Sequence, residues 1–373
     1  MAGRSVNKMK VLHILEGLFA GGTENVVMNW NRHMEHPLFQ FDFLVNNTQP
    51  IYYEEEIKKL GGKILAVPQR KAGIKSILSY THAVYRTLKK NHYDAVVSHM
   101  GYIAGFELLA ARLAGVRRRI AVAHMGYYYD TNRIKIGLYK FLIWLFATDN
   151  WAVSQAAGKM LFWSRFTVIK NGIDLNRFSF KEDTRRKIRA QLGWQDAWII
   201  GMVGRLAEEK NHLFLLNVFK SLSTDFPTMR LLIIGSGRLQ NMIEKQIKNL
   251  HLEEKVKMAG TVSHVEDFYA AMDCLVLPSK YEGAPLTPVE AQAEGLPVLI
   301  SEAVPGEVKI INTQQLPLED ASLWEKSLAN LFQAAPERNF SHAQEALRQA
   351  GFDICVEVKR IEKLLQEFED ANK

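Results

Sequence analysis

The stretch KYEGAPLTPVE, residues 280–290, decides the fold of this chain. It follows an apolar run at 274–278, which predicts a buried parallel strand, and it leads into a helical pattern at 289–293. Pro288 suits the first position of a helix, so Thr287 is predicted as its N-cap. A strand, a polar turn and a helix in this order indicate an anion site in an α/β fold.

The same turn offers backbone donors between two carboxylates. Glu282 and Glu290 lie on either side of its mouth, one in the turn and one in the first turn of the helix. Proline has no N–H group, so the donors left for a phosphate belong to Gly283, Ala284, Leu286, Thr287 and Val289. An ordinary strand-to-helix connection with two solvated carboxylates fits these residues equally well.

Length and composition indicate a globular protein of two domains. The chain has 373 residues, 47% of them hydrophobic and 23% charged. Its two cysteines stand in apolar contexts, which argues against a disulfide framework or a thiolate metal site and favours a reducing, cytoplasmic setting. The most membrane-like segment, 136–153, contains Lys140 and Asp149, so it is too short and too charged to span a bilayer.

Positive charge is concentrated in the first half. Residues 1–174 hold 23 of the 47 Lys and Arg but 12 of the 40 Asp and Glu, so this part carries +11 and the rest −4. A basic half suggests a nucleic acid, an anionic membrane surface or a phosphorylated substrate as partner. A solvated basic face over an internal helix is equally compatible. A mixture of basic and aromatic residues favours the membrane among these partners. The basic residues are Arg117, Arg118, Arg119, Arg133, Lys135 and Lys140, and the aromatic ones are Tyr127, Tyr128, Tyr129, Tyr139, Phe141 and Trp144.

From residue 9 onward, short β-rich runs alternate with longer helical patterns, which predicts a doubly wound parallel sheet. A glycine-rich loop, Gly21-Gly22-Thr23-Glu24, follows the first of these strands. His99 and His124 each directly follow a later strand, at the edge where such sheets carry their catalytic groups. A lone histidine in that position is still more often structural.

A turn signal, Asn171-Gly172-Ile173-Asp174, precedes a second alternating series that starts near residue 198. We therefore place a domain boundary at Gly172, and a cleft between two such halves is a preferred ligand site. In the second series, Gly204 ends a strand, and Arg205 and Lys210 follow within one short loop. A guanidinium and an ammonium together suit a diphosphate, although in isolation two unrelated surface cations fit the pattern better.

Taken together, these motifs resemble those of the family 4 retaining glycosyltransferases, which have the GT-B fold. The resemblance covers nearly the whole chain, and the ordered set of motifs at these spacings is more specific than any one of them. Its members are the 21–24 loop, His124, the 171–174 turn, Gly204-Arg205-Leu206, Glu209-Lys210-Asn211, Gly235-Ser236-Gly237, and Glu282 and Glu290 with seven residues between them.

The resemblance implies a role for each catalytic residue. Arg205 and Lys210 correspond to the cations that neutralise the donor diphosphate, and Glu282 to the residue that faces the transferred sugar. His124 corresponds to the histidine near the anomeric centre, and Glu290 to the carboxylate that accepts hydrogen bonds from the ribose. The implied donor-binding set is Gly21, Gly22, Gly204, Gly283, Ala284, Leu286, Thr287 and Glu290.

The chemistry implied by the family requires no metal and no cofactor. Breaking the anomeric C–O bond leaves negative charge on the diphosphate, which Arg and Lys can stabilise. The chain has no Asp-x-Asp pair, which agrees with a metal-free site. It departs from the family at 283–285, where Gly-Ala-Pro replaces the frequent Gly-Phe-Gly. This variant occurs in bacterial enzymes of exopolysaccharide, capsule and lipopolysaccharide synthesis, and it puts the donor sugar in doubt.

We therefore expect an α/β protein of the GT-B fold, with two Rossmann-like doubly wound domains facing across a cleft. Residues 1–172 would bind the acceptor, 173–350 the nucleotide-sugar donor, and 351–373 would form a helix that packs back on the first domain. The expected activity is retaining, metal-independent transfer of a hexose-type sugar from a UDP-sugar to a lipid-linked glycan or polysaccharide.

The expected location is the cytoplasm, with the basic domain peripheral on the inner face of the plasma membrane and no nucleic acid as partner. Two alternatives remain open at this point. They are a GT-B nucleotide-sugar epimerase and a non-catalytic nucleotide-sugar-binding protein.

Overall fold

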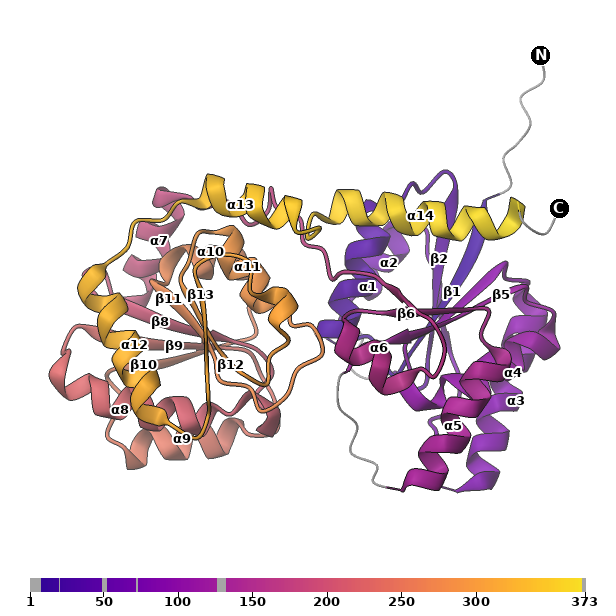
Figure 1. Ribbon diagram of the computed structural model, residues 1–373, viewed down its shortest axis with the longest axis horizontal. Coiled ribbons are helices and arrows are strands. Elements are labelled where there is room, and N and C mark those ends of the chain that lie inside the picture. Colours follow the sequence, from indigo (N-terminus) through magenta and orange to yellow (C-terminus); the bar gives the residue numbers. More distant parts are fainter. Residues whose placement is uncertain (1–7, 20, 49–51, 72, 126–131, 371–373) are drawn as a thin grey trace, which may run out of the picture. The chain divides into compact units, whose positions relative to one another are not determined.

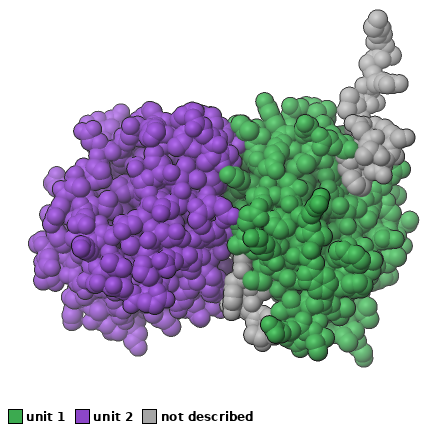
Figure 2. All heavy atoms as spheres, in the orientation of Figure 1, with its two compact units in different colours: residues 1–172, 354–373 green, residues 173–353 purple. Residues whose placement is uncertain are grey.

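The computed structural model describes residues 8–19, 21–48, 52–71, 73–125 and 132–370, with the backbone alone at 368–370. The chain forms two compact units (Figures 1 and 2). Unit 1 comprises residues 1–172 and 354–373, and unit 2 comprises residues 173–353. The tyrosines predicted at 127–129 as part of a membrane-binding surface lie outside the described residues.

Unit 1 is built on a seven-stranded parallel sheet with the order β3-β2-β1-β4-β5-β6-β7. Its central strands are buried on both faces, as expected for a parallel sheet covered by helices. The strands are β1 (Met9–Leu15), β2 (Phe39–Val45), β3 (Ile64–Ala66), β4 (Ala95–Ser98), β5 (Arg118–Ala123), β6 (Asp149–Ala152) and β7 (Thr167–Val168). The helices are α1 (Gly22–His33), α2 (Glu54–Lys59), α3 (Ile74–Asn91), α4 (Ala104–Ala114), α5 (Arg133–Phe146), α6 (Gln155–Leu161) and α14 (Ile354–Asp370), with the 3-10 turn η1 (Gly101–Ile103).

Unit 2 contains a six-stranded parallel sheet with the order β10-β9-β8-β11-β12-β13. Its main core cluster is aliphatic, with Phe219 and Trp324 as buried aromatic side chains. The strands are β8 (Trp198–Val203), β9 (Met229–Ile234), β10 (Val256–Gly260), β11 (Cys274–Leu277), β12 (Val298–Ser301) and β13 (Thr313–Leu316). The helices are α7 (Glu182–Leu192), α8 (His212–Asp225), α9 (Gln240–Asn249), α10 (Val265–Ala271), α11 (Thr287–Ala293), α12 (Ala321–Ala334) and α13 (Phe340–Gln349), with the 3-10 turns η2 (Glu208–Lys210) and η3 (Gly306–Val308).

Each sheet reverses its winding direction once. In unit 1 the chain proceeds outward from β1 through β2 to β3 and then returns to place β4 on the other side of β1. In unit 2 it proceeds from β8 to β10 and then places β11 beside β8. Ligands of open α/β sheets bind outside the carboxyl ends of the strands at such reversals. The carboxyl ends of β1 and β4, and those of β8 and β11, are therefore the favoured positions for a site.

The last helix, α14, belongs to unit 1 and packs on α1. Glu362 of this helix accepts a hydrogen bond from the backbone N–H of Glu35 at 2.6 Å. Where the chain returns to unit 1, a Cβ atom at Gly172 would lie 2.9 Å from the Cα atom of Ile354. Two chain segments pass each other at this point, and the glycine allows the close approach.

The predicted N-cap of α11 is wrong by one residue. The helix begins at Thr287 with Leu286 as N-cap, and no side chain caps it. Pro288 then occupies the second helical position. The N–H groups of the first helical turn have no intrahelical acceptor, so a proline at any of these positions costs no hydrogen bond. Pro288 therefore does not mark the first residue of the helix as sharply as we assumed. The hydroxyl of Thr287 is buried and has no hydrogen-bond partner among the described residues.

Candidate active site

The best-defined cluster in unit 2 lies where β8 and β11 end. The Nζ atom of Lys210 is 2.5 Å from Oε1 of Glu282, and both side chains are largely buried. The hydroxyl of Ser279 donates to the same carboxylate oxygen at 2.6 Å. Two residues proposed for catalysis are thus brought together at the reversal of the sheet, although they are 72 positions apart in the sequence.

The loop after β8 gives Lys210 its position. Leu206 is fully buried and anchors the loop, because its N–H donates to the carbonyl of Ser236 at 3.0 Å. Asn211 has φ 59°, a left-handed conformation that asparagine tolerates better than most residues, and it separates η2 from α8. Gly235 is required next to this loop, since a Cβ atom there would lie 2.0 Å from the carbonyl oxygen of Gly204.

Arg205 is held less firmly than Lys210. Its side chain is 73% exposed and pairs with Glu209 at 2.8 Å. The backbone carbonyl of Glu209 in turn accepts the N–H of Lys280, which ties the loop after β8 to the turn after β11. The guanidinium is therefore exposed to solvent, where an exchange of its partner for an incoming anion costs little.

Glu290 lies deeper, in the first turn of α11. It is 5% exposed, and the hydroxyl of Tyr269 donates to its Oε2 atom at 2.8 Å. Burial raises the pKa of Glu290 to about 7, although the Tyr269 hydroxyl and the charge of Arg177 oppose the shift. This carboxyl group therefore changes its charge near neutral pH.

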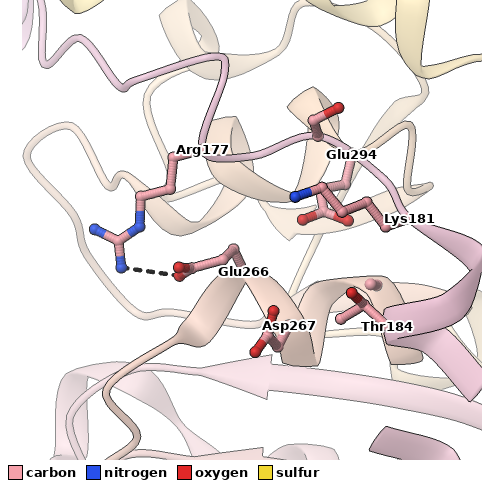
Figure 3. Close-up of a pocket in the computed structure, with 8 residues that line it drawn as sticks. Arg177, Lys181, Thr184, Glu266, Asp267 and Glu294 are labelled. Atoms are coloured by element: carbon pink, nitrogen blue, oxygen red, sulfur yellow. Dashed lines mark hydrogen bonds and ion pairs between the residues drawn. The ribbon is translucent and has the colours of Figure 1, made fainter. Parts of the chain in front are cut away.

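A small pocket lies beside Arg177, the residue whose charge acts on Glu290 (Figure 3). Arg177, which lines the pocket, forms an ion pair with Glu266 at 2.8 Å. Glu294, at the end of α11, is almost fully buried and lies 4.0 Å from Arg338. Burial raises the pKa of Glu294 to about 8. The lining residues are Arg177, Ser179, Lys181, Thr184, Glu266, Asp267, Ala270 and Glu294.

In unit 1, the predicted residues again lie at the reversal of the sheet or next to it. Gly21 is the N-cap of α1 and Gly22 its first residue, directly after the loop that leaves β1. A Cβ atom at Gly22 would meet no described atom within 4 Å, so the backbone there is open to a ligand. His124 follows β5, and its Nε2 atom is 2.7 Å from Nδ1 of His99.

The sequence analysis missed several polar contacts of the site. Tyr269 holds Glu290, Ser279 holds Glu282, and His13 lies 3.0 Å from His99. Tyr269 and His13 carry no local motif, since they sit inside an ordinary helix and an ordinary strand. Ser279 directly precedes the decisive stretch, so its place after the strand could have indicated it.

Comparisons with known proteins agree with this geometry. Residues 184–333 match the family model described as glycosyl transferases group 1, and residues 20–177 match that of glycosyltransferase family 4. The chain is 34% identical over 364 residues to a protein named putative glycosyltransferase EpsF of Bacillus subtilis, covering 93% of this chain and 94% of that protein. The chain belongs to the family 4 glycosyltransferases.

Further similarities support the family and its fold. Over 318 residues the glycosyltransferase is 26% identical to an Escherichia coli protein named UDP-Gal:alpha-D-GlcNAc-diphosphoundecaprenol alpha-1,3-galactosyltransferase, covering 79% of this chain and 80% of that one. A crystal structure of Anabaena HepE with UDP-glucose superimposes with a TM-score of 0.79 at 20% identity, covering 96% of this chain and all of HepE. The predicted GT-B fold and family membership are confirmed.

Proposed function

We propose that this glycosyltransferase moves a hexose-type sugar from a UDP-sugar to a lipid-linked glycan or polysaccharide acceptor in the synthesis of a cell-surface polysaccharide. The observation that carries the proposal is the Lys210–Glu282 pair at the reversal of the unit 2 sheet, with the exposed Arg205 on the loop that also carries Lys210. The names of relatives support the acceptor and donor classes. The Escherichia coli protein is named for UDP-Gal and a diphosphoundecaprenol-linked sugar, and a Staphylococcus aureus relative for capsular polysaccharide biosynthesis.

Donor binding would exchange the partners of this ion pair. In the ligand-free enzyme, Lys210 and Glu282 form an ion pair at 2.5 Å. Each charge is therefore compensated before the donor binds, and each side chain is already in place. On binding, Lys210 and Arg205 would turn to the diphosphate, and Glu282 would accept hydrogen bonds from the sugar hydroxyls. The backbone N–H groups of Leu286 and Thr287 would add donors for the diphosphate. Gly204, Gly283 and Ala284 would let the backbone approach the donor, as would Gly21 and Gly22 in unit 1.

The proposed transfer proceeds with retention at the anomeric carbon. The bond from this carbon to the phosphate oxygen breaks, and the bond to the acceptor oxygen forms on the same face. The acceptor proton passes to a phosphate oxygen of the leaving UDP. Positive charge develops on the sugar and negative charge on UDP, and the cations stabilise the latter. Lys210 and Arg205 fill the electrostatic role that a divalent metal has in other transferases.

The anomeric configuration of the product tests this proposal. The enzyme is incubated with a panel of UDP-sugars and a diphosphate-lipid-linked N-acetylglucosamine acceptor, with and without EDTA, and the product is examined by NMR. We expect one donor to give a product of the same anomeric configuration, at equal rates with EDTA. Inversion would contradict the retaining mechanism, and a requirement for Mg²⁺ or Mn²⁺ the metal-free one. An isomerised donor formed without acceptor would support the epimerase instead.

The binding of UDP-glucose should weaken about tenfold when the pH falls from 8 to 6. Glu290, proposed to accept the ribose hydroxyls, does so best as a carboxylate, whereas its pKa is raised to about 7 in the free protein. Binding would lower this pKa, so protons are released and affinity rises with pH until Glu290 is ionised. Calorimetric titration measures both the affinity and the number of protons released. The diphosphate diester of UDP-glucose does not itself titrate in this range.

Two variants make the pH experiment decisive. Glu290→Gln should bind weakly and with little dependence on pH. Glu294→Gln removes another buried glutamate of raised pKa next to the same helix, and it should keep the wild-type dependence. Equal pH dependence in wild type and Glu290→Gln would remove Glu290 from the ribose site.

We further propose that α5 docks unit 1 on an anionic membrane at the cytoplasmic face, where lipid-linked acceptors are reached. Only Ile143 of this helix is buried, and an apolar stripe on one helix face is exposed. Arg133 and Lys135 lie at the same end of the helix as the first stripe residue. The stripe consists of Ile134, Leu138, Phe141 and Leu145, with Trp144 stacked on Phe141.

The expected basic surface is smaller than the sequence suggested. Arg118 is 3% exposed and forms an ion pair with Asp149 at 2.9 Å. This pair links β5 to β6, so the Arg118 charge is not available at the surface. Arg119 donates to the carbonyls of Phe146 and Val116. Within the 117–119 triplet, only Arg117 is exposed. Among the described residues no helix is long and apolar enough to cross a bilayer.

Replacing Phe141 and Trp144 by serine should abolish most binding to vesicles that contain phosphatidylglycerol, because it removes the two large aromatic rings of the exposed stripe. Co-sedimentation at low and high salt measures this, and binding of the wild type should fall with salt. Trp163→Ser is the control, since Trp163 is 58% exposed elsewhere in unit 1. Equal binding by the double variant and the wild type would contradict the assignment of α5.

A further inference from the structure

Three histidines of unit 1 form a continuous row. His13 lies in the middle of β1, while His99 and His124 directly follow β4 and β5, the next two strands of the sheet. Nδ1 of His13 is 3.0 Å from Nε2 of His99, and Nδ1 of His99 is 2.7 Å from Nε2 of His124. His13 is 1% exposed, His99 9%, and His124 more than either. The row therefore leads from the core of the sheet to its carboxyl edge.

All three rings are neutral at physiological pH. Burial lowers the pKa of His13 to about 3 and that of His124 to about 4. The pKa of His99 is lowered well below its ordinary value, mainly by burial and further by the two neighbouring imidazoles. Among the described residues no carboxylate is hydrogen-bonded to any of these rings. A neutral imidazole has one N–H and one bare nitrogen. Each contact in the row joins the N–H of one ring to the bare nitrogen of the next, so the tautomer of one histidine determines the tautomers of the other two.

The surroundings of His13 select the pattern. Its Nε2 atom is buried and has no hydrogen-bond partner among the described residues. The ring packs against Phe41 and Phe43, with centroids 4.3 and 5.8 Å away. An N–H group is attracted by the negative face of an aromatic ring, whereas a bare nitrogen gains nothing there. The pattern with the proton of His13 on Nε2 would have Nδ1 of His13 accept from Nε2–H of His99, whose Nδ1 would in turn accept from Nε2–H of His124.

We propose that His13 and His99 are positioning residues that hold His124 as a neutral hydrogen-bond acceptor, with its bare Nδ1 offered to a hydroxyl of the sugar substrate. This inference rests on the proposed contact between His124 and the donor sugar. A neutral ring can orient a hydroxyl without placing a positive charge beside the carbon at which positive charge develops. An imidazolium would add that charge, and a neutral ring with an N–H at Nδ1 would donate to the hydroxyl oxygen instead of accepting its proton.

The tautomers can be observed directly in the ligand-free enzyme. The full chain is labelled with ¹⁵N-histidine, the ring signals are assigned through single substitutions, and long-range ¹H–¹⁵N correlation spectra are recorded at pH 7. We expect His124 to show a protonated Nε2 and a bare Nδ1. A protonated Nδ1, or an imidazolium, in the wild type would overturn the proposal.

The His13→Phe variant tests the coupling along the row. Phenylalanine is similar in size but cannot accept from His99. Because the rings at 13 and 99 are nearly parallel, at 19°, phenylalanine presents a C–H edge to Nε2 of His99, so the row should reverse, leaving the Nδ1 of His124 protonated. Turnover should fall roughly 10- to 100-fold, as for other outer hydrogen-bond partners, with little change in the KM of the donor. His13→Asn, whose amide oxygen can accept from His99, should restore the wild-type tautomer and most of the turnover. An unchanged His124 spectrum in a folded His13→Phe variant would refute the coupling.

The spectra and the kinetics separate this inference from the proposed function. If His124→Ala transfers sugar at the wild-type rate, the contact of His124 with the donor fails, whatever the tautomers are. If His124→Ala is impaired but His13→Phe changes neither tautomer nor turnover, the proposed function stands and the positioning row fails.

Discussion

Lys210→Ala should lower the rate of sugar transfer at saturating donor by about 100- to 1,000-fold, as expected when a preorganised group that stabilises developing negative charge is removed. Lys210 is held above the end of β8 and is 2.5 Å from Glu282, so its position is fixed before the donor binds. Because negative charge grows on UDP only as the bond breaks, the loss should fall mainly on kcat. Steady-state release of UDP in the presence of acceptor measures it.

Two controls separate this charge effect from misfolding. Lys245→Ala removes an exposed lysine of α9 in the same unit and should leave kcat unchanged. Lys210→Ala leaves Glu282 without its ion-pair partner, so thermal unfolding should be recorded for both variants. A folded Lys210→Ala enzyme with near-normal kcat would remove Lys210 from the catalytic machinery. Arg205→Ala should cost less, because Arg205 is largely exposed and pairs only with Glu209 among the described residues.

Asp273→Ala should destabilise unit 2 by about 3–5 kcal/mol, because it leaves two partly buried guanidinium groups without their counter-ion. The carboxylate of Asp273 stands directly before β11 and pairs with Arg185 and Arg189, each at 2.5 Å. Its Oδ2 atom also accepts the N–H of Ile199 at 2.7 Å, which joins α7, β8 and β11. Differential scanning calorimetry should show the shift in one transition, that of unit 2.

Asp183→Ala provides the matched control for Asp273→Ala. Asp183 pairs with Arg186 at the same distance of 2.5 Å, also on α7, but its side chain is 92% exposed. An exposed pair contributes about 0–1 kcal/mol, so unfolding should hardly change. Similar losses in the two variants would mean that burial does not set the strength of these ion pairs.

The fold could be predicted from the sequence because parallel strands buried on both faces appear as apolar runs. The runs that became β8 and β11 were recognised within about a residue. β13 was missed. Only Leu316 of its four residues is buried, since it forms the edge of the unit 2 sheet, and its polar residues look like a loop.

The sequence could place Lys210 and Glu282 after strands, but it could not show that they meet. Their contact depends on the strand order, in which β11 lies beside β8 rather than beside β10, the strand that precedes it in the chain. That order follows from how the whole sheet packs and has no local signal. The same is true of the histidine row, because β1, β4 and β5 become neighbours only in the folded sheet.

Buried polar partners are the other part that sequence alone did not reveal. Tyr269 appears in the sequence as a helical residue among alanines, yet its hydroxyl is hydrogen-bonded to Glu290 inside unit 2. A tyrosine can pack as an apolar ring or serve as a donor, and only its neighbours decide which. The change in the charge of Glu290 near neutral pH, on which the predicted pH dependence rests, was therefore not predictable.

The release of UDP from a UDP-sugar, measured with and without a diphosphate-lipid-linked acceptor, tests most directly the claim that this chain transfers sugar at the Lys210–Glu282 cluster. We predict rapid release that requires both the acceptor and Lys210. Release at the same rate without acceptor, or unchanged release by a folded Lys210→Ala variant, would contradict that claim.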